Sequence, residues 1–409
     1  MSSDLIRVAY GSIPKDSGTF TFYRNLRPAL LKRGVELICV SVGTEEGRLW
    51  EHEYADDGCI LLGGKCGNLK KQAEYFSNWC DAENIDIVMG INSTPILSAL
   101  PHLSKNIRIV SRCANGFELG YRISMACAER LMGIIALTPK LKLDLISTYG
   151  ANAEKIFLIP NGINPAPFED AVAQVRGADE KLELGFLGRL EHTQKGVLYL
   201  PGIINALNAR KVPFRFRIAG KGKHYQKLVS LFENEIASGQ VEFVGALTHT
   251  EVPKFLSSLD VFLFTSHFEG CPNALLEAMM AGVVPVSWTI KGVTDFVLDD
   301  GVTGFLAETG DADAFSSHIE TLHQDRKRLD DMHNETAKAA RDRFADTVSA
   351  QAYSEFFHGL MLSPVLVWEP KEWSAFQPDK NFPQTYKRFL PNTLKKAIKN
   401  IFNQLSEQR

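Results

Sequence analysis

The alternation of short apolar runs with amphipathic segments constrains this chain more than any other feature. In the first half of the chain the runs are rich in β-branched residues and are bounded by turn or helix signals, as buried strands are. The segments between the runs have helical periodicity, and Gly34 and Gly150 end two of them. This β-α-β order predicts parallel, doubly wound sheets. The expected strands of the first series are 5–10, 35–42, 85–89, 107–111, 134–137 and 156–159.

The alternation stops once and then starts again. Residues 160–167 read Pro-Asn-Gly-Ile-Asn-Pro-Ala-Pro and carry no helix or strand signal, so we interpret them as a linker. A chain of 409 residues is also long enough for two cores. We therefore predict an α/β protein with a first domain over 1–165, a second over 166–345, and a terminal helix and tail over 346–409 that return to the first domain. The expected strands of the second series are 182–187, 214–219, 241–244, 261–265 and 283–286.

Composition narrows the functional class. The formal net charge of −3 gives no reason to expect a nucleic-acid partner. The seven cysteines are scattered without a CxxC pair, which fits free thiols in a reducing compartment. No apolar run is long enough for a signal peptide or a membrane span. We therefore expect a cytoplasmic protein.

The tail has a different composition from the rest of the chain. From Lys371 to the end, eight Lys or Arg stand against three Asp or Glu. An apolar helical stripe lies opposite several of these lysines, so the tail either docks on its own protein or attaches to an anionic membrane surface, and the sequence leaves both open. The stripe consists of Leu394, Ile398, Ile401, Phe402 and Leu405.

The most informative segment lies in the second domain. The expected strand 261–265 is followed by a loop, and a helix begins near Asn273, which can cap free amides. The carboxyl edge of a parallel sheet is where open α/β folds bind ligands, and a helix start there favours phosphate. Glu269 lies in the loop and Glu277 about one turn inside the helix. The two carboxylates can therefore face different parts of one extended ligand.

This segment resembles the signature of glycosyltransferase family four. Seven residues separate Glu269 from Glu277, and Ala-Met-x-Ala-Gly-x-x-Pro-Val follows. The resemblance covers most of the second domain, and it extends to Pro160-Asn161-Gly162-Ile163 at the domain junction. It implies the GT-B fold, in which two Rossmann-like domains face each other across a cleft and a C-terminal helix crosses back. Further sequence segments that match the family pattern are Phe186-Leu-Gly-Arg189-Leu, Lys195-Gly196, Ile218-Ala-Gly220-Lys-Gly222 and Asp300-Gly-Val-Thr-Gly304.

The resemblance also implies roles for single residues. Arg189 and Lys195 would hold the diphosphate of a nucleotide-sugar donor, which fixed cations do well. Glu269 would bind the sugar near the reacting carbon, and Glu277 would accept hydrogen bonds from the ribose. Among four histidines that we expect to be structural, only His267 could reach the donor. The remaining donor contacts that the resemblance implies are Gly18, Gly188, Gly220, Val244, Gly270, Cys271, Asn273, Ala274 and Leu275.

The first domain departs from the family pattern at two places. Ser17-Gly18 stands where relatives commonly have paired glycines, and Arg112 stands where many have a histidine near the sugar. We expect Ser17 and Thr19 to contact the acceptor. Arg112 either contacts the acceptor or a phosphate, or merely caps a strand. In the second domain, Asp295 replaces a usual Glu.

The activity implied is a retaining transfer of a hexose from a nucleotide-diphosphate sugar, with a UDP-sugar favoured over a GDP-sugar. The acceptor would be a hydroxyl of a glycan or of a lipid-linked molecule in surface polysaccharide or lipopolysaccharide biosynthesis.

Asp311 and Asp313 imitate a metal-binding pair, but they open a helix and we expect Asp311 to be its N-cap. We expect no cofactor and no obligatory metal. The alternative is a catalytically degenerate GT-B protein that binds a nucleotide or a glycan without turnover.

Overall fold

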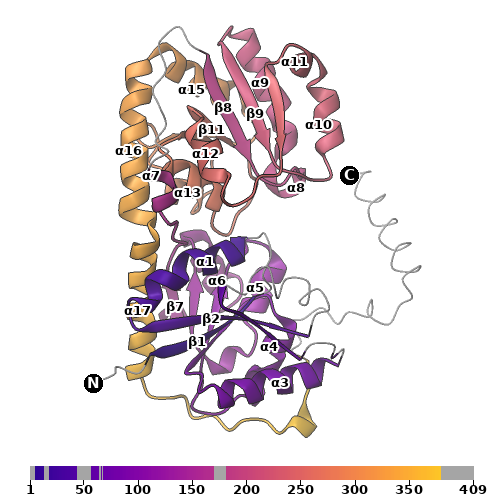
Figure 1. Ribbon diagram of the computed structural model, residues 1–409, viewed down its shortest axis with the longest axis vertical. Helices are drawn as coiled ribbons and strands as arrows, with labels where there is room; N and C mark the ends of the chain where they lie inside the picture. Colours follow the sequence, from indigo (N-terminus) through magenta and orange to yellow (C-terminus); the bar gives the residue numbers. More distant parts are fainter. Residues whose placement is uncertain are drawn as a thin grey trace, which may run out of the picture.

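The computed structural model describes residues 5–12, 18–43, 57–63, 66, 68–169 and 181–378. Within them the chain forms two parallel sheets, one in each half, and the two halves stack along the long axis of the molecule (Figure 1). Helices connect the strands, so the predicted pair of doubly wound α/β domains is confirmed. No helix in these ranges is long and apolar enough to cross a bilayer.

The first sheet has seven strands in the order β3-β2-β1-β4-β5-β6-β7. Its strands are β1 (Ile6–Gly11), β2 (Val35–Val42), β3 (Cys59–Leu62), β4 (Ile87–Gly90), β5 (Arg108–Cys113), β6 (Leu131–Ala136) and β7 (Ile156–Leu158). Its helices are α1 (Gly18–Leu31), α3 (Leu69–Ala82), α4 (Thr94–Ala99), α5 (Glu118–Ser124) and α6 (Pro139–Ser147), with short 3₁₀ turns at Leu100–His102, Ala128–Arg130 and Ala153–Lys155.

The second sheet has six strands in the order β10-β9-β8-β11-β12-β13. Its strands are β8 (Leu182–Leu187), β9 (Phe214–Ala219), β10 (Val241–Gly245), β11 (Val261–Phe264), β12 (Val284–Trp288) and β13 (Phe305–Ala307). Its helices are α7 (Ala166–Glu169), α8 (His192–Lys195), α9 (Leu200–Ala209), α10 (Tyr225–Leu231), α11 (Glu233–Ala237), α12 (Val252–Ser257), α13 (Asn273–Met280), α14 (Thr294–Val297), α15 (Ala312–Gln324) and α16 (Arg326–Phe344), and a 3₁₀ turn covers Val197–Tyr199.

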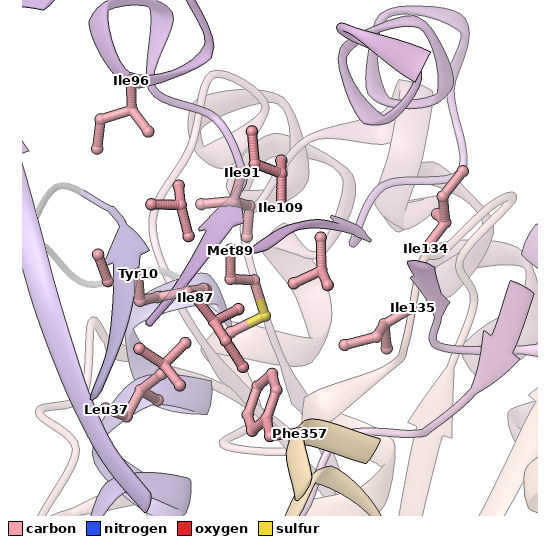
Figure 2. Close-up of a cluster of buried hydrophobic side chains, with 14 of the residues drawn as sticks. Tyr10, Leu37, Ile87, Met89, Ile91, Ile96, Ile109, Ile134, Ile135 and Phe357 are labelled. Carbon is pink, nitrogen blue, oxygen red and sulfur yellow. The ribbon is translucent and has the colours of Figure 1, made fainter. Parts of the chain in front are cut away.

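The last long helix, α17 (Asp346–Leu362), belongs to the core of the first domain. In Figure 1, α16 runs beside the second domain and α17 beside the first, in one column. Figure 2 shows Phe357 of α17 among apolar side chains from the first sheet, including Tyr10, Leu37 and Met89. Burial of these groups is the main favourable term in folding. The predicted crossover helix is therefore confirmed.

The chain crosses between the domains twice, and the two crossings lie side by side. The Ile163 amide donates to the Phe344 carbonyl and the Asp346 amide donates to the Ile163 carbonyl, both at 2.9 Å. A Cβ on Gly162 would lie 2.6 Å from the Asp346 Cα, so glycine is what allows this approach. Backbone hydrogen bonds therefore join the two crossings where the domains meet.

Three details differ from the sequence expectations. Strands β3 and β13, of four and three residues, lie at the edges of their sheets and were not expected. The helical periodicity of 224–236 predicts one helix, but the structure divides it into α10 and α11. Strand β5 continues to Cys113, two residues beyond its expected end, which places Arg112 inside the sheet.

Candidate active site between the two domains

The topology of the second sheet brings two loops together. Strand β8 lies between β9 and β11, so the order of connection reverses there. Because the strands are parallel, the loops that follow β8 and β11 leave from the same edge, where doubly wound sheets bind ligands. The loop after β8 leads to Lys195, and the loop after β11 contains Glu269. The structure therefore places these two predicted residues in contact.

The short helix α8 fixes the position of Lys195. Glu191 caps its start, accepting hydrogen bonds from the amides of Thr193 and Gln194, each at 2.9 Å. Burial opposes ionisation of Glu191, but these hydrogen bonds outweigh it and hold its pKa at about 2. The helix ends at Gly196, whose φ is +62° and whose Cβ, if present, would lie 1.9 Å from the Thr265 carbonyl oxygen. Only glycine fits there, so the backbone directly after Lys195 packs tightly against the end of β11.

The carboxylate of Glu269 is almost completely buried, with 7% of the residue exposed. Its Oε1 lies 2.6 Å from Lys195 Nζ and accepts a hydrogen bond from Ser266 Oγ at 2.8 Å. Its Oε2 accepts from Gln194 Nε2 at 3.1 Å. A buried carboxylate requires such partners, since an unpaired charge in the interior is very costly. Glu269 is thus held rigidly beside the cation.

Gln194 connects the third predicted residue to this pair, and the sequence reasoning missed it. The exposed Arg189 donates to Gln194 Oε1, while the Gln194 amide nitrogen donates to Glu269. Arg189 is therefore joined through one neutral side chain to the carboxylate that pairs directly with Lys195. Its place directly before Lys195 was the only available signal.

Two glycines bring the loops after β8 and β9 into contact. The Gly188 amide donates to the Ala219 carbonyl at 3.0 Å, and Gly220 has a φ of +142°. A Cβ on Gly220 would lie 1.9 Å from the Gly188 carbonyl oxygen. Backbone alone therefore occupies this part of the site, which leaves room for a ligand to approach closely. Val244, another expected donor contact, lies at the end of β10 and is partly exposed.

The start of α13 presents fewer open amides than the sequence suggested. The Asn273 amide donates to the Cys271 carbonyl at 3.0 Å and the Leu275 amide to the Pro272 carbonyl at 2.9 Å. Within the described residues, no acceptor is found for the Ala274 amide. The resemblance implies that Asn273, Ala274 and Leu275 contact the donor; in this conformation the amides of the first and third are occupied by the tight turn that begins the helix.

Glu277 lies one turn further along α13 and lines a pocket of about 440 Å³. Burial raises its pKa to about 7, against the opposing effect of the Lys195 charge. No side chain in the described part of the chain hydrogen-bonds to this carboxyl group, so it is available to a ligand. The pocket lies between α1, the linker and α12, and its other lining residues include Asn25, Ile163, Phe168, Thr250 and Val252.

The domains meet directly at the candidate site. A Cβ on Gly270 would lie 2.0 Å from the Ala114 carbonyl oxygen of the first domain, and one on Gly116 would lie 2.8 Å from the Glu269 carbonyl oxygen. Cys271 is half-buried at this interface, and burial raises the pKa of its thiol to about 11, so it stays neutral. The cleft is therefore closed around Glu269.

The expected contacts from the first domain divide into three cases. Gly18 and Thr19 begin α1 opposite Asn273, and the Thr19 carbonyl accepts a hydrogen bond from Tyr10. Ser17 lies outside the described residues. Arg112 is 2% exposed and its guanidinium is enclosed by protein groups, so in this conformation an acceptor cannot reach it. Capping a strand end does not describe it either, because it lies within β5.

The structure also shows the contacts of Asp311 and His267. Asp311 accepts a hydrogen bond from the Ala314 amide at 2.9 Å and is the N-cap of α15, as predicted. His267 packs edge-on against His192, 5.1 Å between ring centres, and its Nδ1 lies 3.0 Å from the Thr193 carbonyl oxygen. These contacts brace α8 rather than leaving His267 aimed at a donor.

Comparison with known families gives two matches. Residues 168–342 match the family model described as "Glycosyl transferases group 1", and residues 17–167 match "Glycosyltransferase Family 4". The two matches abut and together take in both domains.

Curated relatives are similar over part of their length. A putative colanic acid biosynthesis glycosyltransferase of Salmonella typhimurium is 28% identical over 223 residues, 53% of this chain and 53% of that protein. A 2-deoxystreptamine glucosyltransferase of Streptomyces kanamyceticus is 27% identical over 177 residues, 41% of this chain and 46% of that protein. The chain thus spans about half of the length of these relatives.

Solved structures share the whole fold. A glycosyltransferase from Rickettsia africae aligns with a TM-score of 0.72 at 15% identity, covering 88% of this chain and all of that one. The Anabaena protein HepE, solved in complex with UDP and glucose, aligns with a TM-score of 0.69 at 17% identity, covering 87% of this chain and all of that one. At these identities the likeness concerns the fold alone.

Proposed function

The chain belongs to glycosyltransferase family 4, and we propose that it transfers a hexose from a nucleotide-diphosphate sugar to a hydroxyl group of a glycan or lipid-linked acceptor, with retention of configuration. The observation that carries the proposal is the contact of Lys195 with Glu269 at the switch point of the second sheet. Arg189 is joined to this pair through Gln194, and the pocket that Glu277 lines lies nearby.

The arrangement suits an elongated donor with three parts. The two cations would hold the diphosphate, and the Ala274 amide would add a donor at the start of α13. Glu277 would accept hydrogen bonds from the ribose, with the base in the adjoining pocket. Glu269 would accept hydrogen bonds from sugar hydroxyls, since Lys195, Gln194 and Ser266 fix its carboxylate in one orientation.

The chemistry follows from these positions. As the bond between the sugar carbon and the diphosphate oxygen breaks, negative charge grows on the diphosphate, and preorganised cations stabilise that charge. The acceptor oxygen bonds to the same carbon on the same face, and its proton passes to the departing phosphate oxygen. No side-chain base is then required. The close approach of Gly116 and Gly270 keeps water, a competing acceptor, away from the reacting carbon.

We propose a UDP-sugar as donor and a surface polysaccharide or lipopolysaccharide as destination. HepE was solved with UDP and with UDP-glucose. Relatives include a capsular polysaccharide biosynthesis glycosyltransferase of Staphylococcus aureus, 27% identical over 56% of this chain. The bound UDP and the role in capsule biosynthesis belong to those similar proteins, and they support the proposal by analogy.

We further propose that catalysis needs no metal and takes place at the cytoplasmic face of a membrane. Arg189 and Lys195 supply two positive charges to the diphosphate, which is the role a divalent cation has in other phosphate sites. Attachment would use the basic tail within 371–409. The described residues end at Gln377 and Pro378, so the apolar stripe from Leu394 to Leu405 lies outside them.

The two glutamates provide the test. In titrations with UDP, Glu277→Ala should weaken binding about tenfold or more, because the hydrogen bonds to the ribose are lost. Glu269→Gln should bind UDP nearly normally but lower the rate of UDP release from UDP-sugar in the presence of acceptor. Glu233→Ala, an exposed glutamate on α11, is the control. Unchanged binding and turnover in both variants would remove this assignment.

A further inference from the structure

Arg112 is a buried cation for which the described residues supply no carboxylate. Its Nε donates to the hydroxyl of Tyr353 at 3.1 Å, its Nη2 donates to Asn161 Oδ1, and its guanidinium carbon lies 3.7 Å from the centre of the Phe22 ring. Its Nη1 has no hydrogen-bond partner within the described chain. Phe22, Tyr353 and Asn161 come from α1, α17 and the linker, so three distant segments converge on one side chain.

The hydrogen bonds continue from Asn161 into the second domain. Asn161, itself 4% exposed, donates through Nδ2 to Asn273 Oδ1 at 2.6 Å. Asn273 is the first residue of α13. Its own Nδ2 is the atom closest to where a Cβ on Gly18 would lie, at 3.3 Å. The relay therefore runs from α17 through β5 and the linker to the donor helix, and it ends opposite the start of α1.

The chemistry of arginine fixes the direction of this relay. A guanidinium can only donate hydrogen bonds, so Asn161 must turn its oxygen toward Arg112 and its NH₂ toward Asn273. Asn273 must then accept with its oxygen and present its NH₂ on the opposite side. A histidine at this position could either donate or accept and would not impose one direction.

We propose that Arg112 is a positioning residue that, through Asn161, holds the Asn273 NH₂ toward the space beside Gly18, where it donates to an anionic oxygen of the nucleotide-sugar diphosphate. This inference rests on the proposed function, because it names the ligand of the same site. The buried positive charge also favours an anion across the interface, since within the described residues no carboxylate offsets it. Arg112 therefore contributes to donor affinity without touching the donor.

The test measures UDP affinity in a small set of variants. Asn273→Ala should weaken UDP binding about tenfold, the usual range for a hydrogen bond to a charged group. Arg112→Met should weaken it similarly, and the double variant should be no worse than Asn273→Ala alone, because both changes interrupt one relay. Arg112→Lys keeps a donor-only side chain and should retain binding within about threefold. Asn273→Asp turns an anionic oxygen toward the diphosphate and should bind most weakly.

Arg130→Met is the matched control for loss of a buried arginine. Arg130 is also 2% exposed and also lies in the first domain, where it donates to the carbonyls of Leu100 and Ser104, away from the interface. The Arg130→Met variant should lose thermal stability, as Arg112→Met does, but should keep the wild-type UDP affinity. If wild-type protein binds UDP and Arg112→Met binds it equally, or if the Arg112 and Asn273 effects add, the inference is wrong. If wild-type protein binds no nucleotide, the proposed function fails, and this inference fails with it.

Discussion

Replacing Lys195 with methionine tests whether the buried ion pair at the candidate site is organised as described. Lys195 Nζ lies 2.6 Å from Glu269 Oε1, and the exposed fractions of the two side chains are 16% and 7%. Methionine keeps most of the apolar volume but removes the ammonium group, with its charge and its hydrogen bond to Glu269. Glu269 would then be a buried carboxylate with two neutral hydrogen-bond donors, Ser266 and Gln194.

The loss of stability in Lys195→Met can be worked out from the burial of the ion pair. Breaking a buried pair by removing one partner costs about 3–5 kcal/mol, and because two hydrogen bonds remain, the expected loss is about 3 kcal/mol. For a domain of this size, that loss lowers the melting temperature by roughly 6–12 °C. The double variant Lys195→Met/Glu269→Gln removes both charges and should regain most of the stability, because a neutral amide needs no counter-ion. Turnover should fall about 10²–10³-fold in both variants, since each lacks a cation at the diphosphate.

Thermal and denaturant unfolding without ligand give the stability, and nucleotide release gives the turnover. Lys338→Met is the matched control, since the pair of Lys338 with Asp342 is exposed, at 71% and 60%, and should contribute little to stability. The reasoning is refuted if Lys195→Met is as stable as the wild type, or if the double variant is no more stable than Lys195→Met alone.

Three further predictions follow from other parts of the structure. Because burial raises the pKa of Glu277 to about 7, UDP binding should tighten by about tenfold from pH 6 to pH 8 as the carboxyl ionises, and Glu277→Gln should lose this dependence in titration calorimetry. Gly196→Ala should destabilise the protein by more than about 2 kcal/mol and impair turnover, whereas Gly239→Ala, at a φ of +72° with no atom within 4 Å, should show only the backbone cost of about 1 kcal/mol; equal losses would contradict the role of the Thr265 contact. Deleting 379–409 should reduce sedimentation with anionic vesicles and leave UDP affinity unchanged, and undiminished sedimentation would exclude the tail as a membrane anchor.

The sequence was sufficient for those features that depend on local pattern. The apolar run 182–187 predicted a strand because it is short, rich in large apolar residues and bounded by polar residues, and β8 has the same bounds. The contact of Lys195 with Glu269 was also within reach, because parallel topology brings the loops after neighbouring strands together. Strand β13 was missed, although β7, which is equally short, lies within an expected strand.

Side chains whose environment comes from distant segments could not be placed in advance. The position of Arg112 depends on Phe22 and Tyr353, more than 80 and 240 residues away in the chain, and no local pattern records that the three meet. The place of Gln194 directly before Lys195 was too weak a signal, because a glutamine before a lysine is ordinary on a surface. The amide of Leu275 was expected to be open, but the turn at Pro272 uses it, and such capping depends on backbone geometry rather than on residue type.

The central claim is that the site around Lys195 and Glu269 is a metal-independent donor site for a nucleotide sugar. The most direct measurement is thermal stabilisation and nucleotide release with UDP-, GDP-, ADP- and dTDP-sugars, each with and without EDTA. The account predicts that UDP-sugars stabilise the protein most and are slowly hydrolysed to UDP, with EDTA making no difference. Stabilisation by none of the four classes would contradict it. Binding without any release of nucleotide, even with acceptor glycans present, would instead indicate a degenerate binding protein.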